Sequence, residues 1–407
     1  MKKKLLSLLT ALLFFSSAMW ATDPDYLSFT VTGSGTGTKF YMKKTGTPGA
    51  LKLEYSKDNK ATWQDVPNVS TSAYTIASGT TIYVRTKSAT LETSVGYKDA
   101  SNYWAFNLTN SSANDTVVIS GNIMSLLDQN CQSTTLTEDY VFCNLFAGNS
   151  GNKGGAKIGD LKLPATTLSK GCYQKMFNSF RAVRSGGLPA LPATTLAEDC
   201  YREMFRSVLN LKIAIPANYL PAQSLAKGCY RDMFTGSGFT SAPTLPATEL
   251  AESCYRGMFA NADLTELPAL PATELAPYCY DSMFFNIKTI TSIPKDYLPA
   301  MVMKEGCYRQ MFKNCFKVTQ LPNLPATTLA KDCYNMMFAS VFSSNNVAFG
   351  GILIDLPATE LVEGCYSQMF TSTVFLAGSI SVHFTSWGDG SYTTEWLSSY
   401  YGKFYGP

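Results

Sequence analysis

The side chains best suited to chemistry in this 407-residue chain are one histidine and eleven cysteines. His383 stands alone, which argues against a site with several histidine ligands and against a nucleophile activated by a histidine base. The cysteines include no C-x-x-C pair, and eight of them recur 25 to 32 residues apart, which is not the spacing of a zinc site. The sequence therefore predicts no metal ligand.

Carboxylates and phosphate-binding loops offer no clear catalytic site either. The chain has no G-x-x-x-x-G-K-[ST] loop and no dinucleotide fingerprint. Paired carboxylates could cleave a glycosidic bond, but nothing singles out a pair among Glu198, Asp199, Glu252 and Glu363. We expect a protein that is not an enzyme, that has no catalytic residues and that binds no cofactor.

Composition indicates a folded, exported protein. Apolar residues make up 45% of the chain, and the net charge is +3 with no basic run after the N-terminus, so nucleic acid is a poor candidate partner. Lys2, Lys3 and Lys4 precede an apolar run at residues 5–15 and then small residues, so residues 1–21 have the pattern of a cleaved secretory signal. The run is short for a membrane span, and we expect no transmembrane segment after cleavage.

A fifteen-residue block, LPATTLAEDCYREMF at residues 191–205, organises most of the chain. Seven further copies start at Leu163, Leu220, Leu245, Leu270, Leu298, Leu324 and Leu356. Each copy keeps Leu-Pro-Ala at its start, Cys-Tyr at its tenth and eleventh positions and Met-Phe at its end. A repeat of this length is the signature of a solenoid, in which stacked units complete one another's cores.

The spacing inside the block is that of a helix. Leu196, Cys200 and Met204 are four residues apart, which predicts an apolar stripe on a short α-helix at about residues 196–205. Thr195 and Glu198 have the spacing of a capping box at its start.

The 10 to 17 variable residues between blocks contain brief apolar runs that end in proline, such as residues 211–216 and 290–294. These runs predict one short strand per repeat, stacked into a parallel sheet. The predicted fold is an α/β leucine-rich-repeat solenoid, with short parallel strands on one side and short helices on the other. Outward residues of the strands can vary without disturbing the core, so the binding candidates on this concave face are Lys212, Glu266, Thr291 and Gln320.

Residues 22–125 contain no copy of the block. Alternating apolar residues, such as Leu27, Phe29 and Val31, lie between turn-forming clusters and predict antiparallel strands of a β-sandwich-like domain. One segment, SKDNKATW at residues 56–63, resembles the Asp-box turn SxDxGxTW of sialidases, and we expect an ordinary hairpin there. Residues 126–378 are the predicted solenoid, with eight clear repeats and a degenerate one at residues 141–146, and residues 379–407 are a predicted C-terminal cap.

The block cysteines occupy one equivalent position and are expected to form a buried ladder of free thiols. They are Cys172, Cys200, Cys229, Cys254, Cys279, Cys307, Cys333 and Cys365. Packed helices would hold their Cα atoms about 8–10 Å apart, beyond the reach of a disulfide. Disulfides are the alternative, because export exposes a chain to oxidising conditions. Cys131, Cys143 and Cys315 lie off the ladder and are expected to react or pair more readily.

The block and the segment after it resemble the BspA-like leucine-rich-repeat proteins of bacterial surfaces. The join at Phe312-Lys313-Asn314-Cys315 carries this resemblance most clearly, and it extends over residues 136 to about 385. The LxxLxLxxN motif of standard leucine-rich repeats is absent. The resemblance implies a curved, right-handed solenoid that is exported and displayed for adhesion or molecular recognition.

The main hypothesis is a secreted or cell-surface recognition protein, a monomer that binds a host or bacterial surface protein or glycan along the concave face. One alternative is a structural spacer, in which the solenoid only holds the N-terminal domain away from the cell. A second alternative is carbohydrate binding by the N-terminal domain, with the solenoid as an accessory.

Overall fold

The computed structural model describes residues 23–110, 112–149, 151, 153–341, 352–371 and 380–384. The predicted signal at residues 1–21 lies outside these ranges, as does the predicted C-terminal cap except for residues 380–384. Strand β12 (Ile380–Phe384) pairs in parallel with β11 (Ile352–Leu356). The last strand expected from the sequence, which carries His383, is therefore confirmed.

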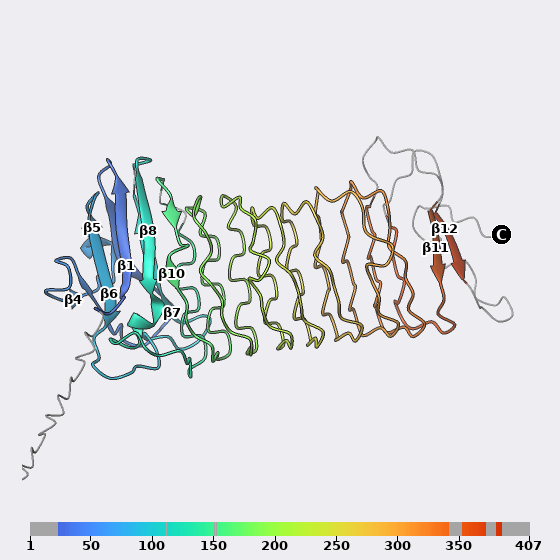
Figure 1. Ribbon diagram of the computed structural model, residues 1–407, viewed down its shortest axis with the longest axis horizontal. Coiled ribbons are helices and arrows are strands. Elements are labelled where there is room, and N and C mark those ends of the chain that lie inside the picture. The colour runs from blue at the N-terminus through green and yellow to red at the C-terminus, as the bar shows by residue number, and fades with distance from the viewer. Residues whose placement is uncertain are drawn as a thin grey trace, which may run out of the picture.

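Two β-sheets form the N-terminal end of the molecule (Figure 1). The larger has the order β10-β8-β1-β6-β3-β4, with β9 also paired to β8. Its strands are β1 (Leu27–Gly33), β3 (Leu53–Ser56), β4 (Gln64–Asp65), β6 (Thr81–Thr86), β8 (Asp115–Asn122), β9 (Ala156–Lys157) and β10 (Leu161–Lys162). The smaller sheet consists of β5 (Tyr74–Ile76), β2 (Thr38–Thr45) and β7 (Tyr103–Thr109). Two 3₁₀ helices, η1 (Ser70–Ser72) and η2 (Ile123–Leu126), complete this region.

The two sheets pack face to face through aromatic side chains. The ring centroid of Phe29 on β1 lies 5.1 Å from that of Phe40 on β2 and 5.0 Å from that of Phe106 on β7. Leu27, Phe29 and Val31 are fully buried, so the alternation seen in the sequence is that of a strand with one buried face. The predicted antiparallel strands are confirmed for β1 to β8, whereas β9 and β10, which come from residues beyond 125, join the larger sheet in parallel.

The expected hairpin at residues 56–63 joins β3 to β4, which are antiparallel. Its turn is organised by Asp58, whose carboxylate accepts hydrogen bonds from the Ser56 hydroxyl (2.8 Å) and the Thr62 amide (2.9 Å). Hydrogen bonds from Thr62 are the main cause that lowers the pKa of Asp58 to about 2. Lys60, which replaces the glycine of the Asp-box pattern, has a φ of 72°, a value that glycine adopts more readily.

The repeated blocks do not form helices, so the predicted helix at residues 196–205 is wrong, and no α-helix occurs among the described residues. Every fourth residue instead has a left-handed backbone conformation with positive φ, as in Asp199 (φ 53°), Glu203 (φ 56°) and Ser207 (φ 59°). The Arg202 amide donates to the Asp199 carbonyl at 3.1 Å, which closes a four-residue turn. Thr195 and Glu198 consequently cap no helix. A succession of four-residue turns repeats apolar side chains every four residues, which is nearly the 3.6-residue period of a helix.

The intervening amides bond to the next repeat along the chain. Tyr201 donates to the Cys229 carbonyl at 3.0 Å, and Phe205 donates to the Met233 carbonyl at 2.9 Å. Equivalent bonds run from Tyr140, in the degenerate copy, to Thr371. We call these hydrogen-bonded turns, from the eighth to the seventeenth position of each copy, the turn ladder. Successive copies are thus neighbouring coils, stacked along the long axis of the molecule (Figure 1). Hydrogen-bonded backbones of this kind lie about 4.8 Å apart.

Two columns of aromatic rings fill the inside of the coils. The tyrosines at block position eleven stack from Tyr173 to Tyr366, with centroids 5.6–6.0 Å apart. The phenylalanines at position fifteen stack from Phe177 to Phe370 at 5.3–6.0 Å. The Phe column continues into the N-terminal sheets, because Phe146 lies 5.4 Å from Phe177 and 5.4 Å from Phe106. The first coil is therefore covered by strand β7.

The variable segments meet through single parallel bridges rather than the strands that were predicted. Ala214 bridges Ser241, and Ser292 bridges Gln320. The parallel direction agrees with the prediction, but the predicted strands at residues 211–216 and 290–294 are not formed. These segments differ in length from 10 to 17 residues, so neighbouring coils cannot stay in register over a longer ladder.

Candidate functional site

The sequence-predicted binding residues all lie at the surface of the variable segments, and three of them lie in a parallel bridge or within two residues of one. We call this exposed surface of the variable segments the bridge face. Lys212, Glu266, Thr291 and Gln320 are all exposed on it. Their exposure leaves them available to a ligand, whereas the apolar residues next to them, such as Ile293, point into the coil.

Two of the four candidates lie on neighbouring coils. The Thr319 amide donates to the Thr291 carbonyl at 2.7 Å, and the Gln320 side-chain amide donates to the Ile293 carbonyl at 3.0 Å. The Ile293 amide in turn donates to the Gln320 carbonyl at 3.0 Å. The backbone thus holds Thr291 and Gln320 in a defined relative position.

The other two candidates are not gathered with them. The Lys212 ammonium forms an ion pair with Asp263, at 2.9 Å, across an intervening coil. Glu266 forms no ion pair among the residues that the structure describes. The four residues are therefore spread along the face and do not line one compact site.

A row of threonines on the bridge face was missed at the sequence level. The Thr265 hydroxyl donates to the Thr240 carbonyl at 3.2 Å, and the Thr319 hydroxyl donates to the Thr291 carbonyl at 2.9 Å. A threonine near the middle of several variable segments was the available signal. Because these hydroxyls retain acceptor lone pairs, the row can accept hydrogen bonds from a polar ligand.

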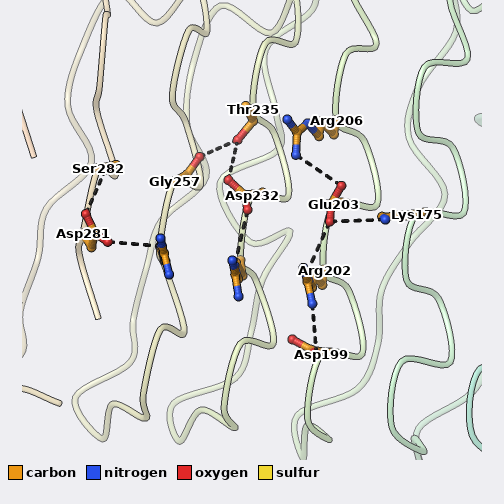
Figure 2. A network of polar contacts seen from close by, with 12 residues as sticks. Lys175, Asp199, Arg202, Glu203, Arg206, Asp232, Thr235, Gly257, Asp281 and Ser282 are labelled. Atoms are coloured by element: carbon orange, nitrogen blue, oxygen red, sulfur yellow. Dashed lines mark hydrogen bonds and ion pairs between the residues drawn. The ribbon is translucent and has the colours of Figure 1, made fainter. Parts of the chain in front are cut away.

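The charged side chains of the turn ladder are bonded to one another. Figure 2 shows Glu203 between Lys175 and Arg206, which lie 3.7 Å and 3.2 Å from its carboxylate. Asp281 is almost completely buried and forms ion pairs with Arg256 (3.1 Å) and Arg309 (2.8 Å) on the coils at either side. A buried carboxylate needs such partners because desolvation of an unpaired charge is costly.

The eighth block position carries charges of alternating sign from coil to coil. The row reads Asp139, Lys170, Glu198, Lys227, Glu252, Pro277, Glu305, Lys331 and Glu363. Ion pairs join Lys170 to Glu198 (3.1 Å), Lys227 to Glu252 (2.8 Å) and Lys331 to Glu363 (3.1 Å). A hydrogen bond to the glutamate raises the pKa of each lysine. Three of the carboxylates considered for catalysis are therefore held by lysines of adjacent coils.

All eleven cysteines are buried free thiols. Burial raises the pKa of Cys200 to about 12, and the same cause raises those of Cys131, Cys143 and Cys315 to about 12. The predicted ladder of buried thiols is confirmed. The predicted reason, a Cα separation of about 8–10 Å between packed helices, is wrong. Coils about 4.8 Å apart place equivalent Cα atoms within disulfide range, although in-register Cβ atoms at that spacing lie beyond the roughly 3.5–4.5 Å that a disulfide needs. Burial also does not set the three off-ladder cysteines apart.

Among the residues that the structure describes, no group of three or more histidine, cysteine, aspartate or glutamate side chains is placed to hold a metal ion. Within the same ranges, no helix is long and apolar enough to cross a membrane.

Comparison of the chain with protein-family models, curated proteins and solved structures finds no match. The resemblance to BspA-like proteins therefore stays a prediction from the repeated block.

Proposed function

We propose that this chain is a secreted or cell-surface recognition protein of the leucine-rich-repeat type, a monomer that binds a protein or glycan along the bridge face. The observation that carries the proposal is the contrast within each coil. Residues of the turn ladder have their amides and charges bonded to neighbouring coils, as in Tyr201 and Glu252. The bridge face holds exposed polar side chains, such as Thr291 and Gln320, that can change without loss of those bonds.

A glycan-binding N-terminal domain is the second candidate, and one aromatic cluster favours it. The Arg85 guanidinium lies 3.8 Å from the centroid of the half-buried Trp63 ring. Tyr26 packs edge-on against the same ring at 5.3 Å. Aromatic faces beside hydrogen-bond donors suit the apolar and polar sides of a sugar ring.

The test uses the exported chain, residues 22–407, because the N-terminal sheets and the first coils share strands and a core. This chain would be screened on glycan and host-protein arrays beside two double variants. Thr291→Lys with Gln320→Lys alters the bridge face, and Gln223→Lys with Thr248→Lys makes the same change at exposed block positions of two adjacent coils.

We expect an array ligand that the bridge-face variant loses and the control variant keeps. Loss in both variants, retention in both, or the absence of any ligand would contradict binding on this face. If binding of the ligand is lost only in the Trp63→Ala variant, the binding site lies in the N-terminal domain.

A further inference from the structure

Exposed cations line the place where the N-terminal sheet meets the first coils. Lys157 lies on β9, and Arg181 and Arg184 lie in the next coil. Ala156 and Val183 form a parallel bridge, and the Ala156 amide donates to the Ala182 carbonyl at 2.7 Å. Lys157 and Arg184 each follow a buried bridge residue by one position, so both side chains point outward from backbones about 4.8 Å apart.

Two glycines lie beside these side chains. A Cβ on Gly155 would lie 3.6 Å from Cδ of Arg184, and a Cβ on Gly186 would lie 3.6 Å from Cβ of Lys157. Both glycines have positive φ values, 104° and 92°, which other residues rarely adopt. The aliphatic part of each cation thus lies beside a glycine of the neighbouring coil, and the side chain is exposed.

The charges of this row are unlike those of the turn ladder. Among the described residues, Lys157, Arg181 and Arg184 form no ion pair, and Asp160, the acidic residue nearest to Lys157 in the chain, does not pair with them either. Lys212, on the following coil, is neutralised by Asp263. Like charges on adjacent strands are destabilising, and elsewhere this chain alternates their sign from coil to coil. A row of cations without counter-charges is suited to an anionic ligand.

The sheet surface beside the cations is rich in hydroxyl groups. Lys157 pairs with Val118 of β8, and Val118 pairs with Thr30 of β1. The Thr30 hydroxyl lies 2.8 Å from that of Thr81, and the Thr116 hydroxyl donates to the Gly154 carbonyl at 3.2 Å. These hydroxyls can exchange hydrogen bonds with the hydroxyls of a sugar chain.

We propose that Lys157 and Arg184 bind an acidic polysaccharide, whose carboxylate or sulfate groups supply the missing counter-charge. A polysaccharide fits better than nucleic acid because the row contains no aromatic side chain on which a base could stack. The site lies at the N-terminal end of the bridge face, outside residues 212–320 that carry the proposed function. Either proposal can therefore fail without the other.

The experiment measures binding of the chain of residues 22–407 to polygalacturonate, dextran sulfate, neutral dextran and duplex DNA at low and physiological salt. The test variant is Lys157→Gln with Arg184→Gln. The control is Lys227→Gln with Arg206→Gln, which removes the same charges from side chains that are paired with Glu252 and Glu203. Melting temperatures of all variants check the fold, and single Lys157→Gln replaces the double variant if the latter does not fold.

We expect both acidic polysaccharides or one of them to bind, neutral dextran not to bind, and added salt to weaken binding. The test variant should lose at least about tenfold in affinity, while the control changes by less than about twofold. Failure of both acidic polysaccharides to bind, equal losses in test and control, or equal or tighter binding of DNA would each overturn the proposal.

Discussion

The turn ladder and the bridge face belong to the same coils and differ in what holds them. In the ladder, alternate amides bond within the coil and to the next one, as Arg202 does to Asp199 and Tyr201 to Cys229. On the bridge face, neighbouring coils meet at single bridges such as that of Ser292 with Gln320. Repetition of the block is therefore explained by the fold, since each ladder position must fit its copies above and below. Variation on the bridge face needs no such match, which leaves it free for recognition.

The same difference extends to electrostatics. Lys227 and Glu252, in the ladder, neutralise one another across coils. Lys157 and Arg184, at the start of the bridge face, lie on adjacent coils and form no ion pair within the described part of the chain. The four predictions below test this contrast between a closed ladder and an open face.

Thiol accessibility should give the largest difference. We expect the ladder cysteines to be alkylated at least about a thousandfold more slowly than the thiol added by Ser292→Cys on the bridge face, because reaction at a buried site requires local opening. Mass spectrometry after alkylation without reductant, in native and denaturing buffer, measures this. Alkylation of Cys200 or Cys229 as fast as the added thiol, or a disulfide between them, would contradict a closed core.

Truncation of a core side chain should give the second-largest difference between the two regions. Phe259 is completely buried in the aromatic column, so Phe259→Ala is expected to lower the free energy of unfolding by about 3–5 kcal/mol. Glu266→Ala, on the bridge face, should change it by less than about 0.5 kcal/mol. Denaturant titrations of both variants provide the comparison, and equal effects would mean that the two regions are not distinct.

The left-handed positions allow a test that separates turns from a helix. At Ser207, with φ of 59°, Ser207→Gly should be neutral or stabilise by up to about 1 kcal/mol, and Ser207→Val should destabilise by about 1–2 kcal/mol. An α-helix would favour valine over glycine by a few tenths of a kcal/mol instead. Thermal melts of the two variants measure this. A glycine variant that melts above the valine variant supports the turns, and the reverse order supports a helix.

The charge row should give the smallest effect. Pro277 takes the place of a cation between Glu252 and Glu305, and it is exposed. Pro277→Lys is expected to stabilise by up to about 0.5 kcal/mol, an increment that high salt removes. Pro277→Gln is the control for the loss of proline. A gain that is equal in lysine and glutamine variants, or insensitive to salt, would show that alternation contributes nothing.

The helix was predicted because the spacing of Leu196, Cys200 and Met204 suits both a helix and a series of four-residue turns. A further signal in the sequence could have separated them. Block position nine is often glycine, as at Gly171 and Gly228, and position seventeen is glycine, asparagine or serine, as at Asn261 and Asn314. Small or turn-forming residues at these two positions, eight residues or two turn periods apart, favour left-handed backbone and disfavour a helix.

The sequence by itself determined the repeat, the identity of the buried side chains and the strands of the N-terminal sheets. Each of these follows from local periodicity and from the need to bury apolar residues such as Phe29 and Tyr201. Only the tertiary structure decided where the amides of the block find their partners. Their acceptors lie about one repeat away, as for Tyr201 and Cys229, and local propensity carries no information about them. The contacts between coils likewise decided which cations are paired, because Lys227 and Lys157 differ in their neighbours across the stack and not in their own chemistry.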